Sequence, residues 1–154
     1  MPRQPPIVKT RELAVALHDL AWLLPRKLDP WAEAGLDPLP PTELEVMRLL
    51  VREPGQSVGE VARELGMQSS NASATIRSLV ARGLLERKTD TRDGRIARLA
   101  PTAKAQAIRR QREEAWGVLL RTRLRRLHPE EVDALLAATD ALIALAANLA
   151  GEVT

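Results

Sequence analysis

The stretch SVGEVARELGMQSSNASATIRSLVARGLLERKT, residues 57–89, decides the fold. It opens with Ser57 and Glu60 at the spacing of a capping box, in which side chains satisfy the free backbone amides of a helix start. Gly66 ends this short helix, and helical spacing of apolar residues predicts a second helix over about 68–82. Two short helices joined by so tight a turn are typical of a helix-turn-helix.

The residues on either side of this stretch complete a small lobe. Upstream, the capping-box form of Thr42–Glu45 predicts a helix that ends before Pro54. Downstream, residues 84–89 and 96–100 are predicted as two strands around the polar turn 90–95. A hairpin directly after a helix-turn-helix is a wing. The apolar stripe expected on the upstream helix consists of Leu44, Met47, Leu50 and Val51.

Amphipathic helices are predicted at both ends of the chain. The first covers residues 11–24 and ends at Pro25, and a proline-rich loop with one short helical turn follows it. A long helix is predicted over 101–127, and a last helix begins at Pro129. The last helix repeats apolar residues in alternating threes and fours, which favours a helical partner. That partner is either the first helix of the same chain or a second copy.

The composition excludes several classes of protein. The chain has 154 residues, of which 45% are hydrophobic, but it contains no Cys, Phe or Tyr, so its core is aliphatic. Without cysteine there is no disulfide, no thiolate metal site and no thiol sensor. His18 and His128 lie far apart, and no catalytic motif is present, so we expect no enzyme activity and no cofactor. No apolar run approaches the roughly 20 residues of a membrane span, which predicts a cytoplasmic protein without membrane contact.

The charge is unevenly distributed along the chain. The net charge is only +3, yet residues 77–126 carry fifteen basic and five acidic side chains. Residues 127–154 carry no basic and five acidic side chains. Of the 23 basic residues 19 are Arg, whose planar guanidinium suits phosphates and guanine edges. Part of the basic stretch fits a salt-bridged surface helix, but its concentration favours a polyanionic partner.

The order of these elements resembles the MarR family of winged-helix transcription regulators. The resemblance covers Thr42 to about Leu149 and is most specific in SVGEVA at 57–62, RGLLER at 82–87 and D-x-x-D-x-R at 90–95. It implies a mainly α fold with a small β-hairpin wing, flanked by N- and C-terminal dimerisation helices. We accordingly expect three parts, which are an N-terminal arm with a dimerisation helix (1–40), a winged helix-turn-helix lobe (41–100) and the connecting and C-terminal dimerisation helices (101–154).

The resemblance implies a homodimer that places two recognition helices and two wings on a palindromic double-stranded DNA operator, as a repressor. Small side chains let the recognition helix enter the major groove, where Asn71 can read adenine. Alternatively, its serines only solubilise an exposed helix. On the wing, Arg92 and Arg95 can enter the minor groove while other basic side chains approach phosphates. The candidate residues are Ser69, Ser70, Asn71, Ser73, Ala74 and Arg77 of the recognition helix, and Arg87, Lys88, Arg92, Arg95 and Arg98 of the wing.

Control by a ligand is a further expectation from the resemblance. Similar proteins bind small aromatic or anionic effectors between their dimer helices and their DNA-binding lobe. Trp22, Trp31, Trp116 and His18 are the residues best able to line such a pocket, although packing is the favoured role of each Trp. The alternative function is a winged-helix protein-interaction scaffold that binds no specific DNA sequence.

Overall fold

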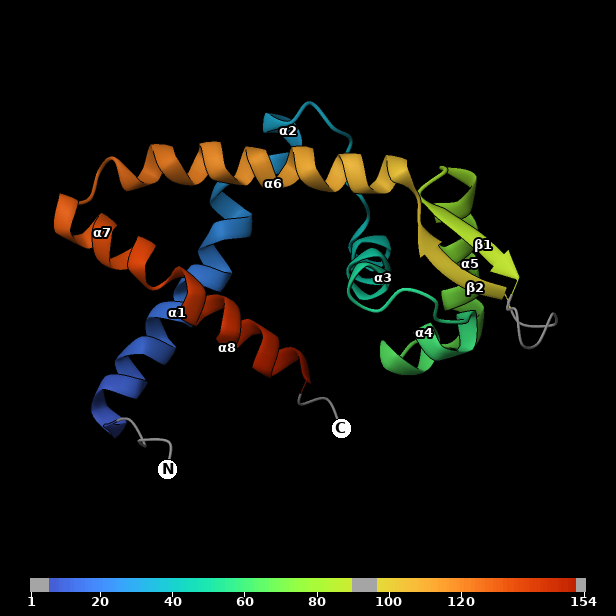
Figure 1. The fold of residues 1–154 in the computed structure, drawn as a ribbon, viewed down its shortest axis with the longest axis horizontal. Coiled ribbons are helices and arrows are strands. Elements are labelled where there is room, and N and C mark those ends of the chain that lie inside the picture. Colours follow the sequence, from blue (N-terminus) through green and yellow to red (C-terminus); the bar gives the residue numbers. More distant parts are fainter. Residues whose placement is uncertain (1–5, 90–96, 152–154) are drawn as a thin grey trace. The chain divides into compact units, whose positions relative to one another are not determined.

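The order of helices and strands follows the sequence prediction closely. The protein is described by a computed structural model that covers residues 6–89 and 97–151, and within these residues it contains eight helices and one two-stranded antiparallel sheet (Figure 1). The predicted fold class, mainly α with a small β-hairpin, is confirmed. The helices are α1 (Ile7–Lys27), α2 (Pro30–Glu33), α3 (Pro41–Arg52), α4 (Val58–Glu64), α5 (Ser69–Ala81), α6 (Ala103–Leu124), α7 (Pro129–Ala137) and α8 (Thr139–Gly151), and the strands are β1 (Leu85–Thr89) and β2 (Ala97–Pro101).

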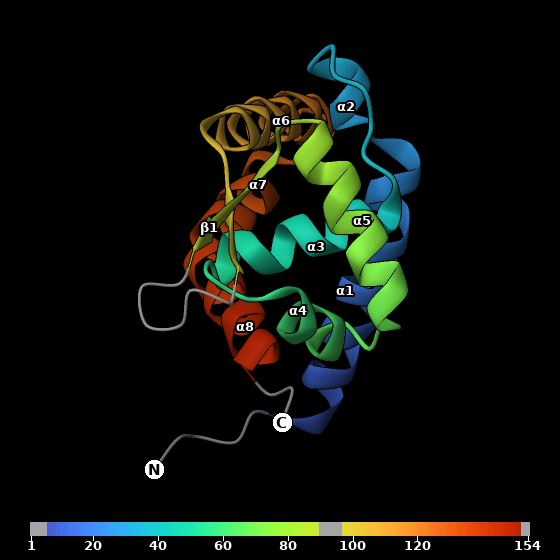
Figure 2. The ribbon, with the colours of Figure 1, turned by 90° about the vertical axis from the view of Figure 1, so that its right-hand side faces the viewer.

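The elements α3, α4, α5, β1 and β2, which we call the lobe, share one aliphatic core (Figure 2). Leu50 of α3, Val61 of α4 and Ile76 of α5 are completely buried in it. Each such side chain stabilises the folded protein by about 1.5–3 kcal/mol when it is buried rather than exposed. The other core members are Val46, Met47, Leu49, Leu79, Leu84, Leu85, Leu99 and Ala105.

The helix-turn-helix is built as predicted. The Ser57 hydroxyl accepts from the Glu60 amide at 3.3 Å, and the Glu60 carboxylate accepts from the Ser57 amide at 2.7 Å. After α4, Gly66 adopts a φ of +60°, a left-handed conformation that glycine adopts without strain. The Met67 amide then donates to the Ala62 carbonyl at 2.8 Å, which closes the turn into α5.

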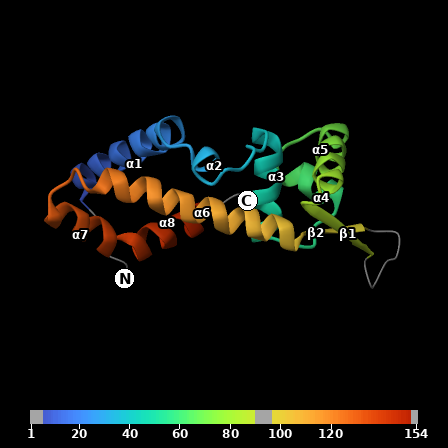
Figure 3. The same ribbon diagram turned by 90° about the horizontal axis from the view of Figure 1, so that it is seen from above.

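The wing hairpin is tied to the rest of the lobe along one edge. β1 pairs with β2 in antiparallel register, with Arg87 opposite Leu99, and β2 leads directly into α6 (Figure 3). On its other edge, Leu99 donates to the Gln56 carbonyl and accepts from the Gly55 amide, both at 2.9 Å. The loop between α3 and α4 is therefore joined to β2 by two backbone hydrogen bonds. The predicted turn at 90–95 lies outside the described residues.

Two predicted helix boundaries are wrong. Pro25 does not end the first helix, because α1 continues to Lys27 with Pro25 inside it. Proline destabilises a helix least near its end. Here the Leu28 amide still donates to the Leu24 carbonyl at 3.0 Å. The predicted capping box at Thr42 is absent, since α3 begins one residue earlier, at Pro41. Proline suits the first helical position because its missing amide has no partner there in any helix.

The C-terminal part also departs from the prediction. The long helix α6 is shorter than expected at both ends, and Thr102 precedes it, accepting from the Ala105 amide at 3.2 Å. The single last helix is two helices, α7 and α8, which meet at a bend of 44°. Thr139 and Asp140 begin α8, and such residues favour helix starts because their side chains compete for backbone amides.

Contacts divide the chain into two compact units, a first one that ends at Ala115 and a second one that begins at Trp116. The three-part division expected from the sequence stays a prediction. Within the described ranges no single helix is long and apolar enough to cross a membrane. The bent pair of α7 and α8 together has the length and apolar composition of a span, by these two criteria alone.

Candidate nucleic-acid interface

Helix α5 has one buried face and one exposed polar face. Ala72, Ile76 and Leu79 are completely buried against the lobe core. Of the six residues predicted to read DNA from this helix, Ser73 is half-buried and the rest are exposed. The structure therefore brings these residues to one solvent-facing surface made of small side chains and one arginine. The exposed members are Ser69, Ser70, Asn71, Ala74 and Arg77.

The first turn of α5 has free backbone amides, which sequence analysis missed. Its N-cap residue, Gln68, forms no side-chain cap, and the turn contains no acidic residue. Uncapped amides at the positive end of a helix favour anions such as phosphate. The signal was visible in the sequence, since α4 starts at a serine with a glutamate three residues later and α5 starts at a glutamine with neither.

The wing contributes a second set of basic side chains. Arg87 and Lys88 on β1 are exposed, and the Lys88 ammonium lies 2.9 Å from the Glu86 carboxylate. Such an exposed pair contributes little to stability and leaves the ammonium accessible. Arg92 and Arg95 lie outside the described residues.

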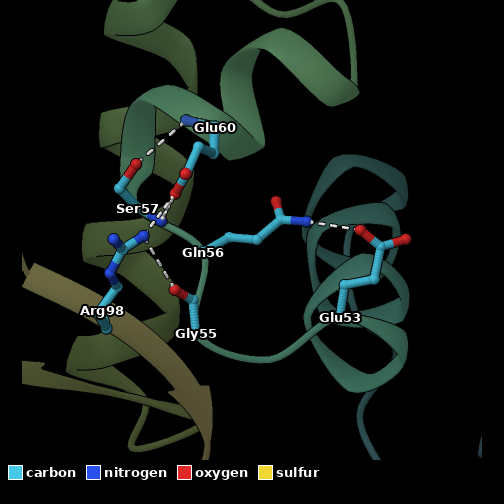
Figure 4. Close-up of polar contacts among 6 residues, drawn as sticks. All are labelled: Glu53, Gly55, Gln56, Ser57, Glu60 and Arg98. Carbon is cyan, nitrogen blue, oxygen red and sulfur yellow. Dashed lines mark hydrogen bonds and ion pairs between the residues drawn. The ribbon is translucent and has the colours of Figure 1, made fainter. Parts of the chain in front are cut away.

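Arg98 is half-buried and fixed in place on β2. Its guanidinium donates to the Glu60 carboxylate at 2.9 Å and to the Gly55 carbonyl at 3.3 Å, as Figure 4 shows. The same Glu60 oxygen accepts from the Ser57 amide, so one carboxylate both caps α4 and holds the wing strand. The Ser57 backbone amide lowers the pKa of Glu60 most, and the charge of Arg98 acts in the same direction.

A buried carboxylate links α3 to the far end of α5. Glu43 accepts a hydrogen bond from the Ser78 hydroxyl at 2.6 Å and forms an ion pair with the Arg82 guanidinium at 2.7 Å. The sequence predicted Glu43 only as part of a capping sequence. Yet Glu43 lies four and seven residues before Met47 and Leu50, so helical periodicity already placed it on the buried face.

A cavity of about 270 Å³ lies beside the lobe, within the first unit, between Trp31, α3 and α6. The Arg112 guanidinium lies 5.0 Å from the Trp31 ring centroid, and its Nε is buried with no hydrogen-bond partner among the described residues. Burial lowers the pKa of Arg112, and the like charge of Arg48 lowers it further. Trp22, Trp116 and His18 do not line this cavity.

A comparison with known proteins matches part of the chain to a family model. Residues 37–96 match the model of the MarR family. This part of the chain is therefore similar to the MarR family. The matched segment contains α3, α4, α5 and β1, which are the elements that carry the exposed helix face and the first wing strand. No match was found among curated proteins.

Several solved structures share the fold over most of the chain. The transcriptional regulator Tm0710 from Thermotoga maritima is 18% identical, with a TM-score of 0.71 over 92% of this chain and 99% of that one. A protein from Pseudomonas aeruginosa PA01 that is proposed to be a transcriptional regulator is 29% identical, with a TM-score of 0.64 over 92% and 98%. A point mutant of S. aureus MepR, solved bound to an oligodeoxyribonucleotide, is 15% identical, with a TM-score of 0.61 over 86% and 96%.

Together, the family match and the shared fold support a transcription regulator. They also agree with the prediction that the chain is not an enzyme, because MarR proteins act as regulators.

Proposed function

We propose that the chain is a sequence-specific regulator that binds double-stranded DNA, acts as a homodimer on a palindromic operator and represses transcription. The observation that carries the proposal is the exposed, uncapped start of α5, with small polar side chains and no acidic residue. A carboxylate here would repel phosphates, whereas free amides attract them. The oligodeoxyribonucleotide bound to MepR, which has the same fold, supports the same partner.

Each part of the surface has its own task in this proposal. Asn71 reads adenine in the major groove, where Ala74 contacts thymine methyl groups and Arg77 reaches a guanine edge or a phosphate. The serines bind phosphates or bases, as do the free amides beside them. Arg92 and Arg95 enter the minor groove, and Arg87 and Lys88 face the phosphate backbone. Arg98, whose guanidinium is held by Glu60 and Gly55, fixes the wing in place.

The homodimer is supported by apolar side chains that a single chain leaves exposed. Ile7 on α1 is 86% exposed and Ile143 on α8 is 63% exposed. Large apolar side chains that stay exposed along a helix favour an interaction surface. In a dimer, the two copies would cover them. The exposed members on α7 and α8 are Leu135, Leu136, Leu142, Ile143, Leu145 and Leu149.

The salt dependence of binding tests the proposal. A duplex selected from a random pool by the wild-type chain is titrated at several salt concentrations, beside a scrambled duplex. If the dimer neutralises about six phosphates, log affinity falls against log salt with a slope of about −5. Affinity that ignores salt, or equal affinity for both duplexes, contradicts the proposal. Equal binding combined with capture of a protein partner would favour the scaffold function.

Two substitutions distinguish residues that recognise bases from residues that anchor the protein to DNA of any sequence. Asn71→Ala should change the order of preference among operator variants, because it removes a base contact. Arg95→Ala should weaken binding to all sequences or to those with A·T flanks, since the minor groove there has the most negative potential. An equal loss on selected and scrambled duplexes after Asn71→Ala would contradict its base-reading role.

The cavity beside Trp31 supports a second activity, the binding of a small aromatic anion that releases DNA. The ring of Trp31 offers an aromatic wall, and the unpaired Nε of Arg112 offers a donor to an anion. Arg48 and Arg109 also line the cavity and add positive charge to it. The ligand must bind better to a conformation that fits DNA poorly, because only differential affinity shifts an equilibrium.

Fluorescence tests this second activity. Benzoate should change the tryptophan emission saturably and weaken DNA binding, and benzyl alcohol serves as the uncharged control. Arg112→Met should abolish the response to benzoate while leaving DNA affinity without ligand unchanged. If benzoate alters neither the emission nor the affinity, aromatic carboxylates are not the effectors.

A further inference from the structure

Glu43 is the one buried charged residue in the described part of the chain, with 7% of its surface exposed. Burial of a carboxylate is costly unless it is paired and hydrogen-bonded. Both conditions hold here, because Ser78 donates at 2.6 Å and Arg82 at 2.7 Å. Both partners belong to α5 or its C-cap, 35 and 39 residues away in sequence. The carboxylate therefore connects α3 to the helix that carries the candidate DNA-reading face.

Apolar packing alone does not fix this helix at one angle. Val46 and Leu50 of α3 share a core with Ile76 and Leu79 of α5, and hydrophobic contacts are not directional. Hydrogen bonds are directional and weaken steeply when they are misaligned. The two bonds of Glu43 therefore add a directional restraint on rotation and sliding of α5 along α3.

The same end of α5 is also held by residues at the start of α6. The Lys104 ammonium donates to the Arg82 carbonyl at 2.8 Å, and the Thr102 hydroxyl donates to the Gly83 carbonyl at 2.7 Å. The other end of α5, by contrast, has no side-chain cap. Helix α5 is thus anchored by polar contacts at its C-terminal end, while its N-terminal turn is the part proposed to meet DNA.

We propose that Glu43 is a positioning residue that sets the sequence specificity of DNA binding without touching DNA. Ser69 and Ser78 are separated by about 14 Å along the helix, at about 1.5 Å per residue. A tilt of about 4° at Ser78 therefore moves the first turn by about 1 Å, which is enough to misalign hydrogen bonds to base edges. Contacts to phosphates and the electrostatic attraction tolerate such a shift better.

The inference rests on the proposed function, and Glu43→Gln tests it. The variant keeps an oxygen that can accept from Ser78 and loses the charge that holds Arg82. Its affinity for the duplex selected by the wild-type chain should fall about tenfold. Its affinity for the scrambled duplex and its salt slope should stay unchanged, because no phosphate contact is lost. Glu45→Gln is the matched control, since it removes the same charge from an exposed position on the same helix.

Ser78 provides an independent variant if Glu43→Gln unfolds. Ser78→Ala removes one of the two bonds at an exposed residue and should lower the ratio of selected to scrambled affinity, whereas Ser78→Thr keeps the hydroxyl and should keep the ratio. Urea unfolding of each variant shows that a folded protein is compared. A general structural defect would instead weaken both duplexes equally.

Three results would overturn the inference. If folded Glu43→Gln and Ser78→Ala keep the wild-type ratio of selected to scrambled affinity, neither bond is needed to position α5 for specific binding. An equal rise of both affinities in Glu43→Gln shows that the carboxylate acts only through its charge. Equal binding of both duplexes by the wild-type chain removes the proposed function itself, and this inference with it. Only the last result bears on the proposed function, so the two failures are distinguishable.

Discussion

The lobe buries its large apolar side chains, whereas the last two helices expose theirs. In the lobe, Leu50, Ile76 and Leu99 are completely buried in one aliphatic core. On α7 and α8, Leu136 and Ile143 are 60% and 63% exposed, and neither helix has a buried residue. A closed core stabilises a fold by itself, whereas an exposed apolar face is typical of an interaction surface. The difference shows that the core of the lobe is closed within one chain, whereas α7 and α8 keep exposed apolar faces that the proposed homodimer would cover.

The largest effect should come from opening the lobe core. Leu50→Ala should lower the free energy of unfolding by about 2–5 kcal/mol, because it leaves a cavity in close-packed surroundings. Its neighbour Val51 is half-buried, so Val51→Ala should cost about 1 kcal/mol. Urea unfolding of the two variants gives the comparison. Equal losses would mean that the lobe core is not closed around Leu50.

The second effect concerns assembly. Ile143→Asp should raise the dissociation constant of the homodimer at least about tenfold, since each copy would bury a charge where an isoleucine had been. Ile143→Val keeps the apolar surface and should leave the constant nearly unchanged. Sedimentation over a range of concentrations measures both variants. A dimer that survives Ile143→Asp would show that α8 faces solvent in the assembly.

A third, smaller effect tests the polar contacts that complete the lobe. Ser57→Ala removes the hydroxyl that caps α4 and should cost about 1 kcal/mol. The Glu60 pKa is lower in the folded chain than its usual value of 4.5, so its contribution is fully present above pH 4.5. That contribution is lost as the pH falls below 4.5 through the folded pKa. Glu60→Gln should remove this part of the acid sensitivity, as unfolding at about pH 3 and about pH 7 would reveal.

The smallest effect is expected on the surface of α6. Arg109 and Glu113 form an ion pair at 2.6 Å, and both side chains are about half exposed. Glu113→Gln should cost only about 0.3–0.5 kcal/mol, and about 1 M salt should abolish the difference. A loss above about 1 kcal/mol would show that this part of α6 is covered in the assembly, as the exposed apolar faces are proposed to be.

Most of the lobe was predictable because its signals are local. The capping box at Ser57, the stop at Gly66 and the apolar spacing of α5 each act within one or two turns, and the structure confirms them. The boundary errors arose where a local signal competes with another. The capping pattern predicted that the helix would start after Thr42, but α3 begins at Pro41 because proline suits the first helical position.

The site was predictable only in part. The exposed face of α5 followed from periodicity, and all of its candidate residues except the half-buried Ser73 are exposed. The contacts of Arg98 with Glu60 and of Glu43 with Arg82 join residues that are 38 and 39 apart, so no local pattern reports them. The half-buried position of Arg112 follows from spacing, because it lies in line with Ala105, Ile108 and Ala115 on α6.

The pairing of β2 with the loop between α3 and α4 affects how the lobe folds during synthesis. Arg98 and Gly55, which it brings together, are 43 residues apart, whereas the helices between them form from local contacts. Bringing two residues together that are so far apart in sequence costs chain entropy before their contact forms. This cost slows folding. On the ribosome, α3, α4 and α5 are therefore made before the strand that completes them. Until residue 99 emerges, the edge at Gly55 and Gln56 lacks its partner.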